Sequence, residues 1–119
     1  MSARVAELAD RVAAFAAERE WSRFHDPKNL AMAIAAEAGE LCSALRWVSS
    51  EHADVAAAEP ERGDAIRQEI GDIAILLLAL CNRIGVSLDE LVIAKLAINA
   101  QHYPVDAARG LPERPRDAI

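Results

Sequence analysis

Apolar residues recur every three or four positions along most of the chain, the spacing of helices that bury one face. In the N-terminal segment the repeat consists of Val5, Leu8, Val12 and Phe15. It predicts a first helix from about Ala3 to Trp21. A second helix is predicted from Pro27 to about Ser49, because Asp26 is a good N-cap and a proline at the first helical position loses no hydrogen bond.

The second half of the chain repeats this pattern. Residues 50–62 lose the periodicity and include Pro60, so we expect a surface connection there. A third helix is predicted from Gly63 or Asp64 to Gly85, a residue suited to the left-handed position after a helix. Its apolar positions are Ile66, Ile70, Ile73, Leu77, Leu80 and Ile84. The sequence "SLDE" at residues 87–90 resembles a capping box and predicts a fourth helix ending near His102.

These elements predict an all-α protein whose protomer resembles a four-helix bundle. Alanine-rich composition with 53% hydrophobic and only 4% aromatic residues agrees with this class. With 119 residues we expect a single helical domain over residues 1–105. Residues 106–119 contain two prolines and mixed charges, so a mobile tail is predicted there.

Charge and cysteine content narrow the function classes. A net charge of −6 argues against nucleic-acid binding, which needs basic surface. The longest apolar run, residues 73–81, is too short to span a membrane, and the charged N-terminal segment is unlike a signal peptide. We expect Cys42 and Cys81 to be small buried residues without a disulfide, which indicates a cytoplasmic protein.

Two pairs of acids interrupt the apolar pattern of the predicted second and third helices. Glu37 and Glu40 lie in "AEAGEL", and Glu69 and Asp72 lie in "QEIGDI". Residues three apart share a helix face, so each pair can act together. If the two helices pack antiparallel, four carboxylates meet at the edge of the core.

Four clustered carboxylates repel one another unless a cation lies between them. An oxygen-only ligand set suits Mg²⁺, with Mn²⁺ as an alternative. The glycines at 39 and 71 suggest close helix approach or room for a ligand. One alternative is an ordinary solvated helix face. A di-iron site is disfavoured because it requires Glu-x-x-His, and no histidine has a glutamate three positions before it.

Four separated segments resemble one known family. They are "REWSRFHDPKNLAMAIAAEAGEL", "RW" at residues 46–47, "EIGDIAILLLAL" and "KLAINAQHYP". In order and spacing they resemble the MazG-like all-helical nucleoside triphosphate pyrophosphatases, and within them the dCTP pyrophosphatase group. MazG proper has two adjacent glutamates at the first motif, whereas here Ala36 precedes Glu37.

The resemblance implies that Glu37, Glu40, Glu69 and Asp72 bind Mg²⁺. It also implies hydrolysis between the α- and β-phosphates of a nucleoside triphosphate, and a homo-oligomer, dimer or tetramer, with sites shared between subunits. We assign Glu40 as the candidate general base, because one carboxylate should accept the proton of the attacking water.

The resemblance further suggests residues that bind the nucleotide. Trp21, His25 and Trp47 are candidates for the base pocket, although the tryptophans could equally cover the helix corner and the bundle. Lys95, Asn99 and Tyr103 share one face of the last helix and could bind phosphate or sugar; a plain polar stripe is the alternative. Lys28 and Asn29 lie at a helix N-terminus, which favours anions.

The predicted function is Mg²⁺-dependent hydrolysis of dCTP or a related nucleotide in nucleotide-pool sanitation. Two alternatives stay open. One is a broad-specificity house-cleaning pyrophosphatase, and the other is a non-catalytic helical interaction module with a structural cation site.

Overall fold

The computed structural model describes residues 2–113, which form helices and no strand. The elements are α1 (Ser2–Glu18), η1 (Ser22–Phe24), α2 (Pro27–Leu45), η2 (Ser50–His52), α3 (Ala53–Ala57), α4 (Pro60–Ile84), α5 (Leu88–His102) and α6 (Val105–Ala108). The predicted all-α class is confirmed. Within the described residues no single helix is long and apolar enough to cross a membrane; only the bent pair of α4 and α5 meets that criterion together.

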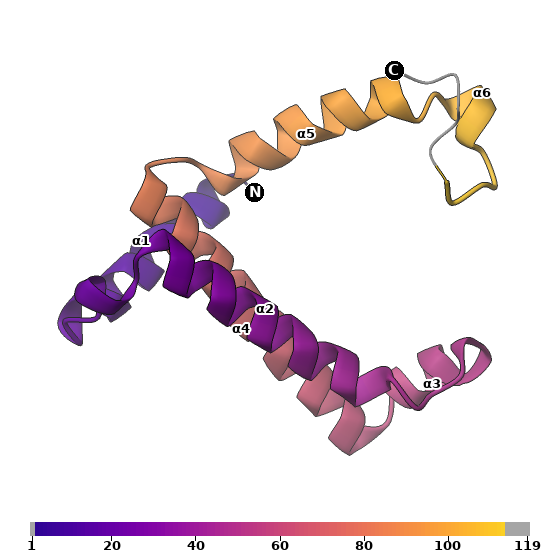
Figure 1. Ribbon diagram of the computed structural model, residues 1–119, viewed down its shortest axis with the longest axis horizontal. Coiled ribbons are helices and arrows are strands. Elements are labelled where there is room, and N and C mark those ends of the chain that lie inside the picture. Colours follow the sequence, from indigo (N-terminus) through magenta and orange to yellow (C-terminus); the bar gives the residue numbers. More distant parts are fainter. Residues whose placement is uncertain (1, 114–119) are drawn as a thin grey trace.

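The frame of the molecule is the antiparallel pair formed by α2 and α4, which lie side by side along their lengths (Figure 1). At one end α1 packs against α4, and there Leu30 is 1% exposed and Leu78, Ala79 and Cys81 are buried. At the other end α3 closes the connection, with Ala56 and Gly63 buried. The fully buried residues therefore lie towards the two ends of the pair.

The fourth long helix, α5, does not complete the bundle. It leaves α4 at an angle of 97° and extends away from the α2–α4 pair (Figure 1). No residue of α5 is buried, although it contains Leu91, Val92, Ile93, Leu96 and Ile98. The radius of gyration is 17.5 Å, against about 13–14 Å for a compact domain of this length. The protomer is open on the side where a bundle would be closed.

Two of the predicted helix ends are confirmed. The Asp26 side chain accepts a hydrogen bond from the Asn29 N–H at 2.9 Å, with Pro27 at the first helical position. Gly85 ends α4 in the left-handed conformation, with φ of 74°.

The first helix ends at Glu18, earlier than the predicted Trp21. Glu20 adopts φ of 54°, and the Trp21 and Glu20 N–H groups donate to the carbonyls of Ala16 and Ala17. This is a Schellman ending, which usually uses glycine at the left-handed position. Glutamate occupies it here, so the sequence contained no glycine signal for the turn.

Two further boundaries and one cap differ from the prediction. The second helix ends at Leu45 instead of Ser49, and the connection contains the short helix α3. The third helix begins at Pro60, which occupies the same favourable first position as the proline of α2. The capping box is wrong: the Ser87 hydroxyl donates to the carboxylate of Asp89, and the Ser87 side chain accepts no capping bond from a backbone N–H.

The cysteine prediction is half right. Cys81 is buried, but Cys42 is exposed on α2, and neither forms a disulfide. The short helix α6 (Val105–Ala108) overlaps the start of the predicted tail, and residues 114–119 lie outside the described part of the chain, so the mobility of the tail stays a prediction. The domain boundary at residue 105 stays a prediction.

Two glycines of α4 should respond to alanine in opposite ways. A Cβ at Gly63 would lie 2.6 Å from the Ala57 carbonyl oxygen, whereas a Cβ at Gly71 would meet nothing within 4 Å. We expect Gly63→Ala to lower the free energy of unfolding by about 1–3 kcal/mol through overpacking. Gly71→Ala should raise it by about 0.5–1 kcal/mol. Urea denaturation of both variants tests this, and a neutral or stabilising Gly63→Ala would contradict it.

Candidate metal centre

The antiparallel pairing of α2 and α4 brings the predicted acids together. Glu37 from α2 and Glu69 and Asp72 from α4 each offer a carboxylate oxygen within 4.8 Å of the others. Glu37 and Glu69 are half-buried, and Asp72 is exposed. Glu40 lies outside this group of three and is exposed, but its charge still acts on Glu69.

Glu69 occupies the most unfavourable position for a negative charge. Its Oε2 atom is inaccessible to solvent and has no hydrogen-bond partner among the described residues. The pKa of Glu69 is raised from 4.5 to about 7, chiefly by a hydrogen bond with the Glu37 side chain. Desolvation and the negative charges of Glu37, Asp72 and Glu40 add to this shift. Without a cation, the folded protein therefore keeps the Glu69 proton up to about pH 7.

The donor set fits a hard divalent cation. All ligand atoms are carboxylate oxygens, which Mg²⁺ and Mn²⁺ prefer, and the buried Glu69 oxygen lacks another partner. The nearby Gly39 and Gly71 make no close helix contact, because a Cβ at either position would meet nothing within 4 Å. Of the two predicted uses of these glycines, close helix approach within the protomer is therefore wrong, and open space remains.

A cluster of aromatic rings lies at the corner between α1 and α2. The Trp21 ring meets the Phe15 ring edge-on at 5.7 Å between centroids and lies 5.9 Å from the His25 ring. Trp21 is exposed and His25 is half-buried. His25 also lines a hollow of about 180 Å³ between α1, η1 and α4. Trp21 and His25 are thus neighbours, as a shared base pocket requires.

The other candidates on α2 have different surroundings. The Asn29 amide donates to the Asp26 carboxylate at 2.9 Å and to the Phe24 carbonyl at 3.2 Å, so it fastens the helix start. Lys28 is exposed beside it. Trp47 is 86% exposed, with the Arg46 guanidinium over its ring at 5.2 Å.

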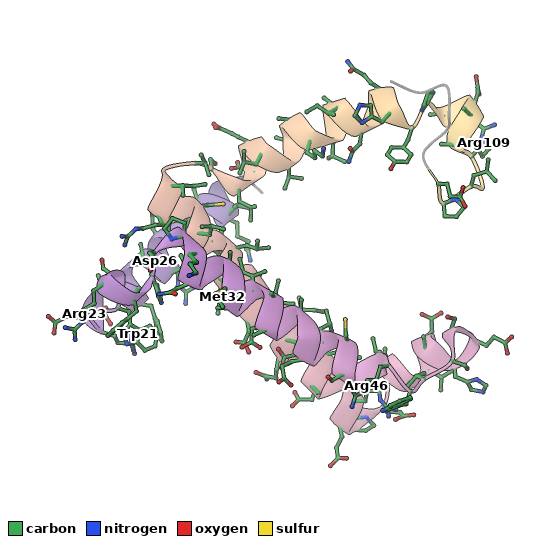
Figure 2. The ribbon with its side chains drawn as sticks, in the orientation of Figure 1. Trp21, Arg23, Asp26, Met32, Arg46 and Arg109 are labelled. Atoms are coloured by element: carbon green, nitrogen blue, oxygen red, sulfur yellow. The ribbon has the colours of Figure 1, made fainter. Side chains whose placement is uncertain are left out.

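The two tryptophans lie at opposite ends of α2, as the positions of Trp21 and Arg46 in Figure 2 show. The 19 residues of α2 span about 28 Å. Trp21 and Trp47 of one protomer therefore cannot contact the same nucleobase.

Lys95 and Asn99 lie on α5 and Tyr103 directly follows it, and α5 extends away from the α2–α4 pair (Figure 1). Lys95 and Tyr103 are exposed and Asn99 is half-buried. The structure does not bring these three residues to the acids of the same chain.

Sequence analysis missed contacts that hold the aromatic corner. The Arg19 guanidinium lies 3.5 Å from the centroid of the Phe15 ring. Arg83 of α4 donates to the Ser22 carbonyl at 2.8 Å, across 61 residues. The four-residue spacing of Phe15 and Arg19 was a usable signal for the first contact. Nothing local indicates the second.

Helical pairs with facing carboxylates define a class of all-α proteins that bind a divalent cation between two helices. Comparison with known proteins makes this specific. Residues 32–117 match the profile of the MazG-like family. The chain is 42% identical over 98 residues to dCTP pyrophosphatase 1 of Rattus norvegicus, covering 82% of this chain and 58% of that protein. The human dCTP pyrophosphatase 1 is 38% identical over 97 residues, with 82% and 57% covered.

A solved structure agrees with these relatives. The crystal structure of a pyrophosphatase from Archaeoglobus fulgidus matches with a TM-score of 0.78 and 33% identity, covering 85% of this chain and 93% of that one. The chain belongs to the MazG-like family. This confirms the resemblance found in the sequence, including its similarity to dCTP pyrophosphatases. The chain spans a little over half the length of the curated relatives it matches.

The raised pKa of Glu69 predicts a pH dependence of stability. Between pH 4.5 and about 7 the folded state keeps a proton that the unfolded state has lost, so stability falls as pH rises through this window. We expect the melting temperature of the metal-free protein to decrease from pH 5 to pH 8. Glu69→Gln should remove much of this slope.

The matched control is Glu7→Gln, an exposed acid on α1, which should retain the slope. Thermal melts in the presence of a chelator measure both variants. An unchanged slope in Glu69→Gln would assign the dependence to other groups.

Proposed function

We propose that this protein is a Mg²⁺-dependent nucleoside triphosphate pyrophosphatase that hydrolyses dCTP or a closely related nucleotide to the monophosphate and pyrophosphate. The observation behind this proposal is the convergence of Glu37, Glu69 and Asp72 within 4.8 Å in a member of the MazG-like family. The names of its relatives, dCTP pyrophosphatase 1, support the substrate. Its role would be the sanitation of the nucleotide pool.

Glu37, Glu69 and Asp72 would hold the cation, with Glu40 completing the set. When bound, the cation neutralises phosphate charge and lowers the pKa of a coordinated water. Glu40 is exposed on α2, three residues after Glu37, and its charge acts on Glu69. We assign it the proton of that water.

Trp21 and His25 would bind the base at the corner between α1 and α2, where stacking and an edge hydrogen bond are both available. Lys28 would attract phosphate at the exposed N-terminus of α2. Asn29, whose amide already bonds within the corner, would act on the nucleotide through the position of this helix start.

We also propose a homo-oligomer, dimer or tetramer. Ile93 and Leu96 of α5 are 66% and 62% exposed, a costly arrangement for a lone protomer. Within one chain, Trp47 lies far from Trp21. The acids lie far from Lys95, Asn99 and Tyr103. A second subunit would let these residues reach a shared site. Free cysteines at 42 and 81 support a cytoplasmic location.

The activity is tested with a panel of nucleoside triphosphates and Mg²⁺, scoring pyrophosphate against orthophosphate. We expect pyrophosphate, with dCTP among the best substrates. Glu40→Gln should lower kcat by about a hundredfold or more, because a general base contributes this much. Glu7→Gln should be unaffected.

Orthophosphate as the product would refute cleavage between the α- and β-phosphates. Equal turnover of many bases would favour a broad house-cleaning enzyme. Absence of any turnover would favour an interaction module.

The oligomer is tested by placing a charge on α5. Leu96→Asp should reduce the molar mass measured by light scattering after size exclusion, because an aspartate is costly in an apolar interface. Val55→Asp, at a position 68% exposed on α3, is the matched control and should keep the wild-type mass. A monomeric wild-type protein would overturn the proposal.

A further inference from the structure

Glu37 and Glu69 meet only in one register of α2 against α4. A slip of one helical turn would displace them by about 5.4 Å, which exceeds the 4.8 Å within which the ligand atoms lie. Apolar packing fixes this register weakly near the acids. Over residues 31–45 of α2 and 64–77 of α4 no residue is fully buried. Another contact is needed to hold the two helices in step.

Arg62 provides such a contact between the two helices. Its Nε atom donates a partly buried hydrogen bond to the Ala44 carbonyl oxygen of α2 at 3.0 Å. Its Nη1 atom lies 2.8 Å from the Glu59 carboxylate. One N–H of the guanidinium thus bonds to Glu59, the N-cap of its own helix, and another bonds to Ala44 of the facing helix.

The Ala44 carbonyl is a group that needs a donor. It lies in the last turn of α2, which ends at Leu45. The N–H four residues later, which would be its helical partner, therefore lies beyond the helix. A cation is favourable at this negative end of α2. The same cation in the first turn of α4 is opposed by the dipole of α4. The ion pair of Arg62 with Glu59 supports its own helix, whereas its charge favours the end of the facing helix α2.

The spacing connects this hydrogen bond to the acids. Glu37 precedes Ala44 by seven residues, and Glu69 follows Arg62 by seven residues. Seven residues are close to two full turns, about 10.5 Å along each axis. In an antiparallel pair, the same alignment of the two helices therefore produces both the contact of Arg62 with Ala44 and the contact of Glu37 with Glu69.

We propose that Arg62 is a positioning residue that holds α2 and α4 in the register at which Glu37, Glu69 and Asp72 form a cation site. Its effect on hydrolysis rests on the proposed function, whereas its effect on cation binding does not. The side chain of Arg62 bonds to Ala44 and Glu59 and to none of the three acids of the cation site. It acts through the relative position of two helices.

The test measures Mn²⁺ binding to the full chain without nucleotide, by the electron paramagnetic resonance of free Mn²⁺. Arg62→Met keeps the length of the side chain but removes the donor. We expect its Kd for Mn²⁺ to rise about tenfold, the usual cost of losing a group that orients metal ligands. Arg62→Gln, too short to reach the carbonyl, should behave alike and serves if Arg62→Met does not fold. Arg62→Lys should recover part of the affinity.

The matched control is Glu59→Gln, which removes the ion pair but leaves the bond to Ala44. It should bind Mn²⁺ like the wild type. If the enzyme is active, Arg62→Met should need more metal for half-maximal rate yet approach the wild-type kcat at saturating metal. A purely stabilising role would not produce this split.

Unchanged Mn²⁺ affinity in a folded Arg62→Met or Arg62→Gln would overturn the proposal, whatever the activity. Weaker binding without any hydrolysis in the wild type would support the role of Arg62 and refute the proposed function instead.

Discussion

Repulsion between carboxylates on the facing sides of α2 and α4 is the constraint around which this structure is organised. A pair of helices would pack better with leucine at these positions, and the raised pKa of Glu69 records the electrostatic cost. The cost is sustained because burial at both ends of the pair, at Leu30 and at Gly63, keeps the helices together. A cation bound between Glu37, Glu69 and Asp72 would remove this repulsion.

The remaining elements serve this pair to different degrees. The helix α1 covers one end and presents Trp21 at the corner, held by the bond from Arg83 to Ser22. The helix α3 closes the other end. The helix α5 contributes little packing within the protomer and exposes most of its apolar residues. The α2–α4 pair thus holds the acids, and α5 extends from it with most of its apolar residues exposed.

Much of this arrangement could be predicted from the sequence. Helical periodicity placed the four long helices, and Asp26 and Gly85 marked two ends correctly because their signals are local. The acids of both motifs were found because spacing by three fixes a shared face. The ending at Glu20 was missed because a left-handed glutamate has no distinctive sequence signal.

Other features depend on tertiary structure. Apolar periodicity identifies the apolar residues of α5, but it does not show whether they pack against the rest of the same chain. Spacing could not separate Glu40 from the three acids that converge, because each acid lies three residues from its pair partner and so shares a helix face with it. The contact of Arg62 with Ala44 joins an arginine to a backbone carbonyl 18 residues away. Because every residue has a backbone carbonyl, the sequence does not indicate which one accepts this bond.

The site also has a simple topology. Its three converging acids belong to the α2–α4 pair, and Glu37 and Glu69 are 32 residues apart in the chain. The cost in chain entropy of closing such a loop grows only slowly with its length. The acid cluster thus needs only the pairing of α2 with α4, and α5 contributes no acid to it. A nascent hairpin would already present these carboxylates together.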